Sequence, residues 1–422
     1  MRISFPYPKI NPVDVPKKNL LGIFSPSILK IKETEKEIVE KAFSQPIGSE
    51  PLSQILKGYK NVLIVVDDYT RTTPVQTILP RLLEEMERGG VKSDGIKILI
   101  GLGTHRSMTE DEITGKFGKD IPKRYPIFNH TWWDQSQLIN LGETEKGTPI
   151  FVNRMVQQAD FIVGIGQIVP HRISGFSGGG NIIQPGICGE ETTGRTHWLA
   201  AQFSGREILG KVENPVKEEI EKVAQKVGLR WIVNTIQDGS GRLVGVVAGD
   251  PLKAYREGAR KSFEIYKSIL PQEADIVMTD SHPYDSELWL AAKGIYAAEL
   301  GVRQGGVTIL VTLCTEGVSP SHPEILELGY QTYEEVDRKV RQGMIKKLTM
   351  AAHLVHVGRV IKERGRGIMV SQGIPKQETE KLGFLYAKTV QEALEIGFSL
   401  VGRDGKVAVF QRGGEILPVI QK

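Results

Sequence analysis

Cysteine is nearly absent from this sequence. Only Cys188 and Cys314 occur among its 422 residues, and they lie far apart in the chain. Two distant cysteines provide neither a disulfide framework nor the CxxC spacing of a zinc site, and the HExxH motif is also missing. These absences exclude small disulfide-stabilised proteins and the common cysteine- or histidine-based zinc sites.

Long apolar segments are missing as well. The longest runs, such as NVLIVV at 61–66 and TILVTLC at 308–314, have the length of a β-strand, whereas a membrane-spanning helix needs roughly 20 apolar residues. The first ten residues, MRISFPYPKI, lack the apolar core of a signal peptide. We therefore expect a cytoplasmic protein with no membrane partner.

No charge of one sign dominates the chain. It contains 54 Lys and Arg residues and 50 Asp and Glu residues, for a formal net charge of +4, and the basic residues are dispersed. Because nucleic-acid binding usually requires clustered positive charge, we expect no nucleic-acid partner. With 40% hydrophobic and 25% charged residues, the composition is that of a globular protein long enough for two domains.

What the sequence does contain is a regular alternation of strand and helix patterns. The stretch 74–90 begins with proline and ends with glycine, as many helices do. The capping-box spacing from Ser107 to Glu110 predicts a helix over 108–117. The predicted strands are 61–66, 95–101, 159–166, 274–279, 307–313 and 368–371. This alternation is typical of α/β proteins, which bind ligands at the carboxyl ends of mainly parallel strands.

A second series of strands begins after the short segment Leu270–Gln272, which predicts two domains. Residues 1–270 form an N-terminal α/β domain, with residues 1–54 as a peripheral lead-in, and residues 271–422 form a C-terminal α/β domain. We expect mainly parallel sheets in both and an active-site cleft between them.

The stretch 167–200 contains the most suggestive chemistry. His171 and His197 stand on either side of a loop that contains Gly175 and the consecutive glycines 178–180. Glycines allow several backbone N–H groups to point into one concavity, which suits a phosphate. Histidine is both a common metal ligand and a common general base. The glycines alone favour a flexible surface loop, but the two flanking histidines favour a site.

Polar residues also follow the first two predicted strands. Asp67, Asp68 and Arg71 follow the first strand, and His105 follows the second. Arginine is a natural partner for a carboxylate or a phosphate, although an Asp–Arg pair that caps the next helix fits this stretch equally well. His105 alone would fit an ordinary surface histidine. Because three strand ends carry charged or basic residues, we favour one shared site.

A nicotinamide dinucleotide site is disfavoured by the glycine spacing. The pairs Gly101/Gly103 and Gly164/Gly166 both follow strands, but neither has the third glycine of the fingerprint. Residues 106 and 169, where that glycine would stand, are arginine and valine. An ordinary dehydrogenase is therefore a poor fit.

Lys293 is the residue of interest in the second predicted domain. It lies in the segment LWLAAKGIYAAELG at 288–301, where it could contact an anionic substrate or simply be a solvated helix lysine. His353 and His356 are three residues apart in an apolar helical stretch, in which packing is the commoner role. The remaining histidines, 130, 282 and 322, receive no assignment.

Four segments together resemble the nickel-dependent lactate racemase family. They are DDYTRTTP at 67–74, GLGTHRSMT at 101–109, PHRISGFSGGGN at 170–181 with the later Pro185–Gly186 and His197, and LAAKGI at 290–295. They follow the family's order, and the resemblance extends over nearly the whole chain. The family uses a nickel-pincer nucleotide (pyridinium-3,5-bisthiocarboxylic acid mononucleotide nickel), in which two sulfurs and one carbon bind the metal. One protein histidine completes a square-planar site, a geometry typical of Ni(II).

The resemblance implies catalytic roles for four residues. His105 and His171 are the paired acid/base residues, one for each face of the substrate. Arg71 and Lys293 hold the substrate carboxylate.

The resemblance also implies how the cofactor is held. His197 is the nickel ligand, and Asp68 has an orienting role at the site. The cofactor-binding loop, which receives the nucleotide phosphate, consists of Ser177, Gly178, Gly179, Gly180 and Asn181.

The sequence departs from the family at position 181. Lactate racemases of the family carry a lysine there, which holds the cofactor covalently through a thioamide, whereas this chain has Asn181. The amide nitrogen of asparagine is a poor nucleophile, so we expect a non-covalently held cofactor. The substrate is then a 2-hydroxy acid for which lactate, malate and sugar acids are all candidates.

The predicted function is a racemase or epimerase, an isomerase that inverts the C2 centre of a 2-hydroxy acid. The C2 hydrogen is poorly acidic, so it is expected to pass to the cofactor as hydride while a histidine takes the hydroxyl proton, which gives a 2-keto acid. The expected partners are a small-molecule substrate and the enzymes that make the cofactor, and an oligomer is compatible with the sequence. The alternative is a nucleotide- or phosphate-binding protein of the same fold that has lost the nickel-pincer chemistry.

Overall fold

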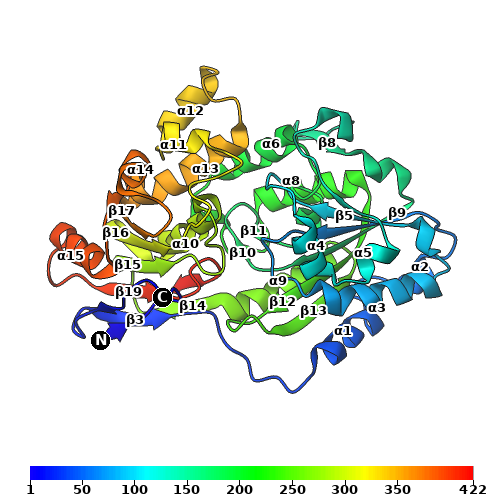
Figure 1. Ribbon diagram of the computed structural model, residues 1–422, viewed down its shortest axis with the longest axis horizontal. Coiled ribbons are helices and arrows are strands. Elements are labelled where there is room, and N and C mark those ends of the chain that lie inside the picture. The colour runs from blue at the N-terminus through cyan, green and yellow to red at the C-terminus, as the bar shows by residue number, and fades with distance from the viewer. Residues whose placement is uncertain (422) are drawn as a thin grey trace.

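Two α/β units, each built around a six-stranded sheet, form the structure (Figure 1). The computed structural model describes residues 1–421. The first sheet has the order β13 (Leu243–Gly249), β12 (Leu229–Gln237), β9 (Phe161–Gln167), β4 (Val62–Asp67), β5 (Ile96–Gly101), β6 (Ile127–Asn129). The second has the order β18 (Leu385–Tyr386), β17 (Gly365–Ser371), β16 (Val302–Thr312), β15 (Ala274–Asp280), β19 (Val407–Phe410), β3 (Leu20–Phe24). Within these sheets all pairs are parallel except β12 with β13, so the predicted fold class is confirmed.

Helices and short strand pairs surround the two sheets. The helices of the first unit are α1 (Glu35–Ser44), α2 (Leu52–Ile55), α3 (Val75–Arg88), α4 (Glu110–Phe117), α5 (Ile121–Arg124), α6 (Glu190–Ala201), α7 (Gly205–Ile208), α8 (Pro215–Val227) and α9 (Lys253–Tyr266). Those of the second are α10 (Leu288–Gly301), α11 (Glu324–Leu328), α12 (Tyr333–Arg341), α13 (Leu348–Gly358), α14 (Lys376–Lys381) and α15 (Val390–Val401). The two-stranded pairs are β1 (Arg2–Ile3) with β2 (Val13–Asp14), β7 (Leu138–Glu143) with β8 (Pro149–Asn153), β10 (Pro170–His171) with β11 (Gly175–Phe176), and β14 (Lys267–Leu270) with β20 (Leu417–Ile420). Along residues 1–421, no helix has both the length and the apolar character that a membrane crossing requires.

Strand β4 illustrates why continuous apolar runs become central strands. All six of its residues, VLIVVD, are buried, as in a parallel sheet covered on both faces. Leu63 and Val65 belong to the same buried cluster as residues of α8 and α9. Ile64 and Val66 belong to the cluster that contains residues of α1 and α3. Alternate side chains of one strand therefore fill the two faces of the first unit.

The order of the strands creates a crevice at their carboxyl ends. From β4 the chain passes through α3 to β5 and β6, and it then returns to the other side of β4 as β9. In open α/β sheets, ligands bind where the strand order reverses in this way. The second sheet reverses similarly between β15 and β19. The residues that follow these strands are therefore in position to form a site.

The helix predicted over 108–117 begins two residues later than expected. Its N-cap is Thr109, which forms a capping box with Glu112, and α4 covers Glu110–Phe117. Arg106 binds both carboxylate oxygens of Glu112 at 2.8 and 2.9 Å. Two possible capping boxes overlap in this stretch, Ser107–Glu110 and Thr109–Glu112. The prediction from Ser107 was wrong, because the Glu112 carboxylate binds both the Thr109 N-cap and Arg106.

The first strands of the chain lie with the second unit. Strand β3 pairs with β19, with Leu20 opposite Val407 and Phe24 opposite Phe410. Residues 20–24 therefore lie outside the N-terminal domain 1–270 in which we expected them, and they form an edge of the second sheet rather than a peripheral lead-in. We propose that the second domain begins near residue 271, as predicted, and also includes these N-terminal strands.

Candidate active site

Most of the predicted site residues meet in one cavity between the two units. Its volume is about 170 Å³, and its walls come from residues that follow β4, β5, β9 and β19 and from α6, α10 and α13. The predicted site residues that line it are Asp68, Arg71, His105, His171, Ser177, Gly178, Asn181, His197 and Lys293. Gly179 and Gly180 lie outside this lining. The structure thus brings together side chains from both halves of the chain.

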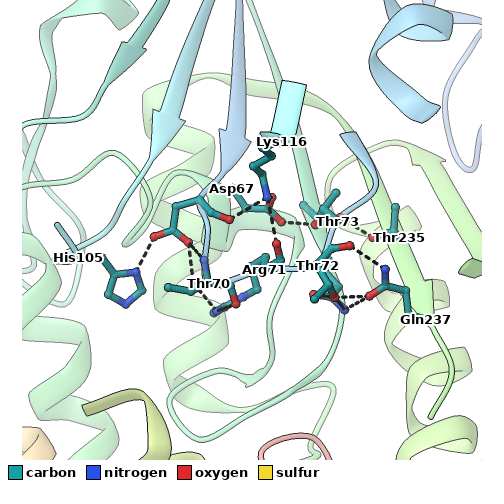
Figure 2. Close-up of polar contacts among 12 residues, drawn as sticks. Asp67, Thr70, Arg71, Thr72, Thr73, His105, Lys116, Thr235 and Gln237 are labelled. Atoms are coloured by element: carbon teal, nitrogen blue, oxygen red, sulfur yellow. Dashed lines mark hydrogen bonds and ion pairs between the residues drawn. The ribbon is translucent and has the colours of Figure 1, made fainter. Parts of the chain in front are cut away.

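The loop after β4 connects His105 to Arg71 (Figure 2). Nδ1 of His105 lies 2.7 Å from Oδ2 of Asp68. The other carboxylate oxygen, Oδ1, accepts hydrogen bonds from the backbone N–H and the hydroxyl of Thr70, at 3.0 and 2.6 Å. The Thr70 hydroxyl oxygen in turn accepts from Nη1 of Arg71 at 2.8 Å. One carboxylate therefore orients both the histidine and the arginine.

Asp68 also determines which nitrogen of His105 is free. Burial alone would raise the pKa of Asp68, but His105, Arg71 and Thr70 outweigh it and lower the pKa to about 2. The ionised carboxylate only accepts hydrogen bonds, so Nδ1 of His105 donates to it. Nε2 is then the unprotonated nitrogen of the neutral ring and can act as a general base.

Three residues that the sequence analysis did not select hold this loop in place. Nζ of Lys116 lies 3.0 Å from Oδ1 of Asp67 and donates to the carbonyl oxygens of Asp68 and Arg71 at 2.8 and 3.1 Å (Figure 2). Gln237 donates to the Thr72 carbonyl at 2.8 Å. A further residue, Gln167, donates to the side-chain oxygen of Gln237 at 2.6 Å. The one feature that could have pointed to the two glutamines from the sequence is their position, since each is the last residue of a strand.

The second candidate base, His171, is neutral in its partly buried position. Burial lowers its pKa well below the usual value, and the positive charges of Lys293 and Arg71 lower it further. Its Nδ1 lies 3.1 Å from the Ser174 hydroxyl. Both candidate bases thus have one ring nitrogen engaged with a side chain and, across the described residues 1–421, one nitrogen without such a bond.

His197 presents a lone pair from the helix that follows the glycine-rich loop. Its Nδ1 donates to the Thr193 carbonyl, one turn earlier in α6, at 2.9 Å. Burial lowers the pKa of His197 to about 4, although this hydrogen bond opposes the shift. Its Nε2 is therefore unprotonated at neutral pH, which is the form that binds metals. Within residues 1–421, no group of three or more His, Cys, Asp or Glu side chains is arranged to hold a metal ion.

Two basic side chains of the cavity wall, those of Arg71 and Lys293, converge on one aromatic ring. Nζ of Lys293 lies 3.4 Å from the centroid of the Tyr284 ring, and the Arg71 guanidinium carbon lies 5.9 Å from it. Nζ of Lys293 is shielded from solvent and has no hydrogen-bond partner among residues 1–421. Burial lowers the pKa of Lys293 well below its usual value, and Arg71 adds to this. An anion that entered the cavity would supply the partner that this lysine lacks.

Replacing Lys293 by methionine is expected to stabilise the fold. The change removes a cation–π contact worth about 0.5–2 kcal/mol, but it also removes a buried ammonium group whose desolvation costs several kcal/mol. We expect a net gain of about 1–3 kcal/mol in the free energy of unfolding, measured by urea denaturation. Lys116→Met is the matched control, because this ammonium has several oxygen partners and its loss should destabilise. A Lys293→Met protein that is less stable than the wild type would contradict the argument.

The glycines of the 177–181 loop are required by packing inside the protein. A Cβ at Gly179 would lie 2.9 Å from the Tyr255 ring, and one at Gly180 would lie 3.1 Å from Cβ of Ala224. The backbone N–H of Gly179 is already donated to Asn234 at 2.7 Å. Ser177 is also used internally, because its hydroxyl donates to the Gln167 carbonyl at 2.7 Å. The glycine pattern therefore reflects close packing against α8 and α9 and does not by itself favour a phosphate.

Two histidines of the second unit, His322 and His353, belong to an aromatic stack. The ring of Trp289 lies between those of His322 and His353, with centroid distances of 4.3 and 4.2 Å. Both ring nitrogens of His353 are near tyrosine hydroxyls, those of Tyr296 at 3.1 Å and Tyr330 at 3.2 Å. This agrees with the packing role expected for His353, and Trp289 and His353 form part of the cavity wall.

The chain is similar to known proteins over most of its length. Residues 9–207 match the family described as the lactate racemase N-terminal domain, and residues 269–417 match the lactate racemase C-terminal domain. The chain is 29% identical over 428 residues to a lactate racemase of Thermoanaerobacterium thermosaccharolyticum, covering 98% of each sequence. It is 27% identical to a lactate racemase of Lactiplantibacillus plantarum, covering 90% of each.

Solved structures show the same similarity. The structure of the lactate racemase apoprotein from Thermoanaerobacterium thermosaccharolyticum covers 100% of both chains, with a TM-score of 0.87 and 27% identity. A structural-genomics protein from Thermotoga maritima covers 94% of this chain and 100% of its own, with a TM-score of 0.75 and 25% identity.

Proposed function

Because the chain belongs to the lactate racemase family, we propose that it is a racemase, an isomerase that inverts the C2 centre of a 2-hydroxy acid. The observation that most supports this is the presence of two histidines and two basic side chains in one cavity. His105 and His171 each have Nδ1 engaged by a side chain, and Arg71 and Lys293 line the same space. Inversion requires a base on each face of the substrate, and this cavity offers two.

The substrate carboxylate would bind between Arg71 and Lys293. Arginine can bind a carboxylate through two parallel hydrogen bonds, and Lys293 has an ammonium without a partner among the described residues. Binding there would orient C2 and its hydroxyl group toward the histidines. His105 would take the hydroxyl proton from one enantiomer and return a proton in the reverse direction, and His171 would do so for the other.

The residues present fit a metal that arrives as part of an organic cofactor. Neutral His197 offers one nitrogen. The cavity of about 170 Å³ has room for an aromatic ring, since cavities of ~150 Å³ accommodate benzene. We propose that His197 holds the nickel of a nickel-pincer nucleotide, with Asp68, Asn181 and the loop from Ser177 to Gly180 nearby. When bound, this cofactor would accept the C2 hydrogen together with its electron pair and return it.

The test of this function is racemisation by protein produced together with the enzymes that make the cofactor. Single enantiomers of lactate, malate and a sugar acid, each carrying deuterium at C2, are incubated with the purified protein and analysed by chiral chromatography and mass spectrometry. We expect inversion of at least one substrate with the deuterium retained in the product. Washout of the deuterium into water would contradict transfer to the cofactor. Absence of inversion by nickel-containing protein across a panel of 2-hydroxy acids would favour the nucleotide-binding alternative.

Because position 181 is an asparagine, we expect that the cofactor can be removed intact. Its amide oxygen accepts from Lys217 at 2.6 Å and its amide nitrogen donates to Ser174 at 3.1 Å, so neither atom acts as a nucleophile. Denaturation of the loaded protein should release the whole cofactor, and intact-mass measurement should give the unmodified polypeptide. A covalent adduct on any residue of the 177–181 loop would contradict this prediction.

A further inference from the structure

A buried lysine lies behind the cofactor-binding loop and has no role in the chemistry described above. Lys217 is in the first turn of α8 and only 1% exposed. Its Nζ donates to the Gly178 carbonyl at 2.8 Å and to Oδ1 of Asn181 at 2.6 Å, and it lies 3.5 Å from the centroid of the Tyr255 ring. A cation at a helix N-terminus opposes the helix dipole, and a buried ammonium is costly. The hydrogen bonds that Lys217 donates must therefore offset these costs.

The ammonium of Lys217 fixes the orientation of the Asn181 amide. An ammonium group only donates hydrogen bonds, so the oxygen of the amide must face it. The amide nitrogen consequently faces the Ser174 hydroxyl, 3.1 Å away. Burial lowers the pKa of Lys217 below its usual value, and Glu221 opposes this shift and favours the charged form.

The hydrogen bonds of Ser174 link the Asn181 amide to His171. The Ser174 hydroxyl has a single proton, which it donates to the Phe176 carbonyl at 2.8 Å. Its oxygen therefore accepts from the amide nitrogen of Asn181 and also from Nδ1 of His171 at 3.1 Å. With Nδ1 protonated, Nε2 of the neutral His171 ring is the nitrogen that can take a proton from substrate.

We propose that Lys217, Asn181 and Ser174 form a positioning chain that holds His171 in the tautomer with a free Nε2, an inference that rests on the proposed role of His171 as an acid/base residue. The chain gives Asn181 a function of its own in place of a cofactor tether. It also parallels the other side of the cavity, where Asp68 sets the tautomer of His105. The tautomers of the two bases are thus set by different groups. A carboxylate sets that of His105, and a chain of hydrogen bonds that ends at an ammonium group sets that of His171.

The α8 helix is anchored independently of Lys217, which makes the chain testable. The N-cap Asn214 accepts from the backbone N–H groups of Val216 and Lys217 at 3.2 and 2.9 Å, and its own amide donates to the Ser174 carbonyl at 3.2 Å. Lys217→Met removes the ammonium and keeps most of the side-chain volume and this cap. Asn181→Ala is a second variant at a position only partly buried, and it removes the link to Ser174 with little risk to folding.

The experiment reads the tautomer of His171 directly by ¹⁵N NMR of cofactor-free protein labelled on histidine, with the signal assigned from a His171→Gln variant. We expect protonated Nδ1 in the wild type and a mixture of tautomers in Ser174→Ala, Asn181→Ala and Lys217→Met. The matched controls are Ser262→Ala, which loses a buried hydrogen bond to the Ile168 carbonyl at 3.0 Å, and Lys222→Met, on the outer face of α8. Both controls should keep the wild-type signal.

A retained Nδ1–H tautomer in Ser174→Ala, or in both Asn181→Ala and Lys217→Met, would overturn the proposal. In loaded protein the same three variants should lower kcat with little change in KM, since the carboxylate-binding residues are untouched. The NMR result does not depend on racemisation. A tautomer change in a protein that inverts no substrate would therefore reject the proposed function alone, and inversion with an unchanged tautomer would reject the positioning chain alone.

Discussion

His105→Ala is expected to reduce the rate of racemisation by roughly 10²- to 10⁴-fold, the usual contribution of a positioned acid/base group. The reason is the loss of Nε2 as the proton acceptor on one face of the substrate. Steady-state rates measured from each enantiomer separately provide the comparison. His171→Ala should give a loss of similar size, because each inversion uses both histidines.

Asp68→Asn tests whether His105 acts through its tautomer. The amide nitrogen of asparagine can donate to Nδ1 of His105, which would force the proton onto Nε2, the wrong nitrogen for a base. We expect a large fall in kcat with the fold retained. His282→Ala is the control, since this histidine does not line the cavity. Near-normal activity in His105→Ala, His171→Ala and Asp68→Asn together would reject the two-base mechanism.

His197→Ala is expected to abolish nickel retention while the protein stays folded. His197 is the one residue to which we assign a metal-binding role, and within residues 1–421 its ring makes a single hydrogen bond, to the Thr193 carbonyl. Metal content after gel filtration, measured by mass spectrometry, should fall to background, and the thermal midpoint should change little.

The contrast between the three histidines makes this result specific. His105→Ala and His171→Ala should retain nickel and lose racemisation, whereas His197→Ala should lose both. Normal nickel content in His197→Ala would contradict the assignment of His197 as the nickel ligand. Loss of nickel in all three variants would instead point to general damage to the cavity.

Much of this architecture could be predicted from local patterns. The strand at 62–67 is a continuous apolar run, and such runs become buried parallel strands wherever helices cover both faces of a sheet. The polar residues Asp68, His105 and His171 all follow such strands, so their convergence followed from the geometry of parallel sheets. The particular role of each residue came from the resemblance to a known family, since spacing alone left ordinary alternatives open.

What could not be predicted depends on contacts between distant parts of the chain. The Asp68–His105 bond spans 37 residues, and the Lys217–Asn181 bond spans 36. Neither has a local signature in the sequence. The glycine-rich loop suggested a phosphate site for a related reason. The sequence shows where a backbone lacks side chains, but it does not show whether a ligand or Tyr255 fills the space.

The pairing of β3 with β19 has a consequence for how the protein is made. Leu20–Phe24 is translated long before its partner Val407–Phe410, because most of the sequence lies between them. The second sheet therefore closes only after Val407–Phe410 has been synthesised, and β3 has to wait until then for its partner strand. A fragment that starts at residue 271 would have the opposite defect, an exposed edge along β19 where other chains can add. The two halves are thus unsuited to separate expression, and the second unit that walls the cavity is complete only once β19 has been synthesised.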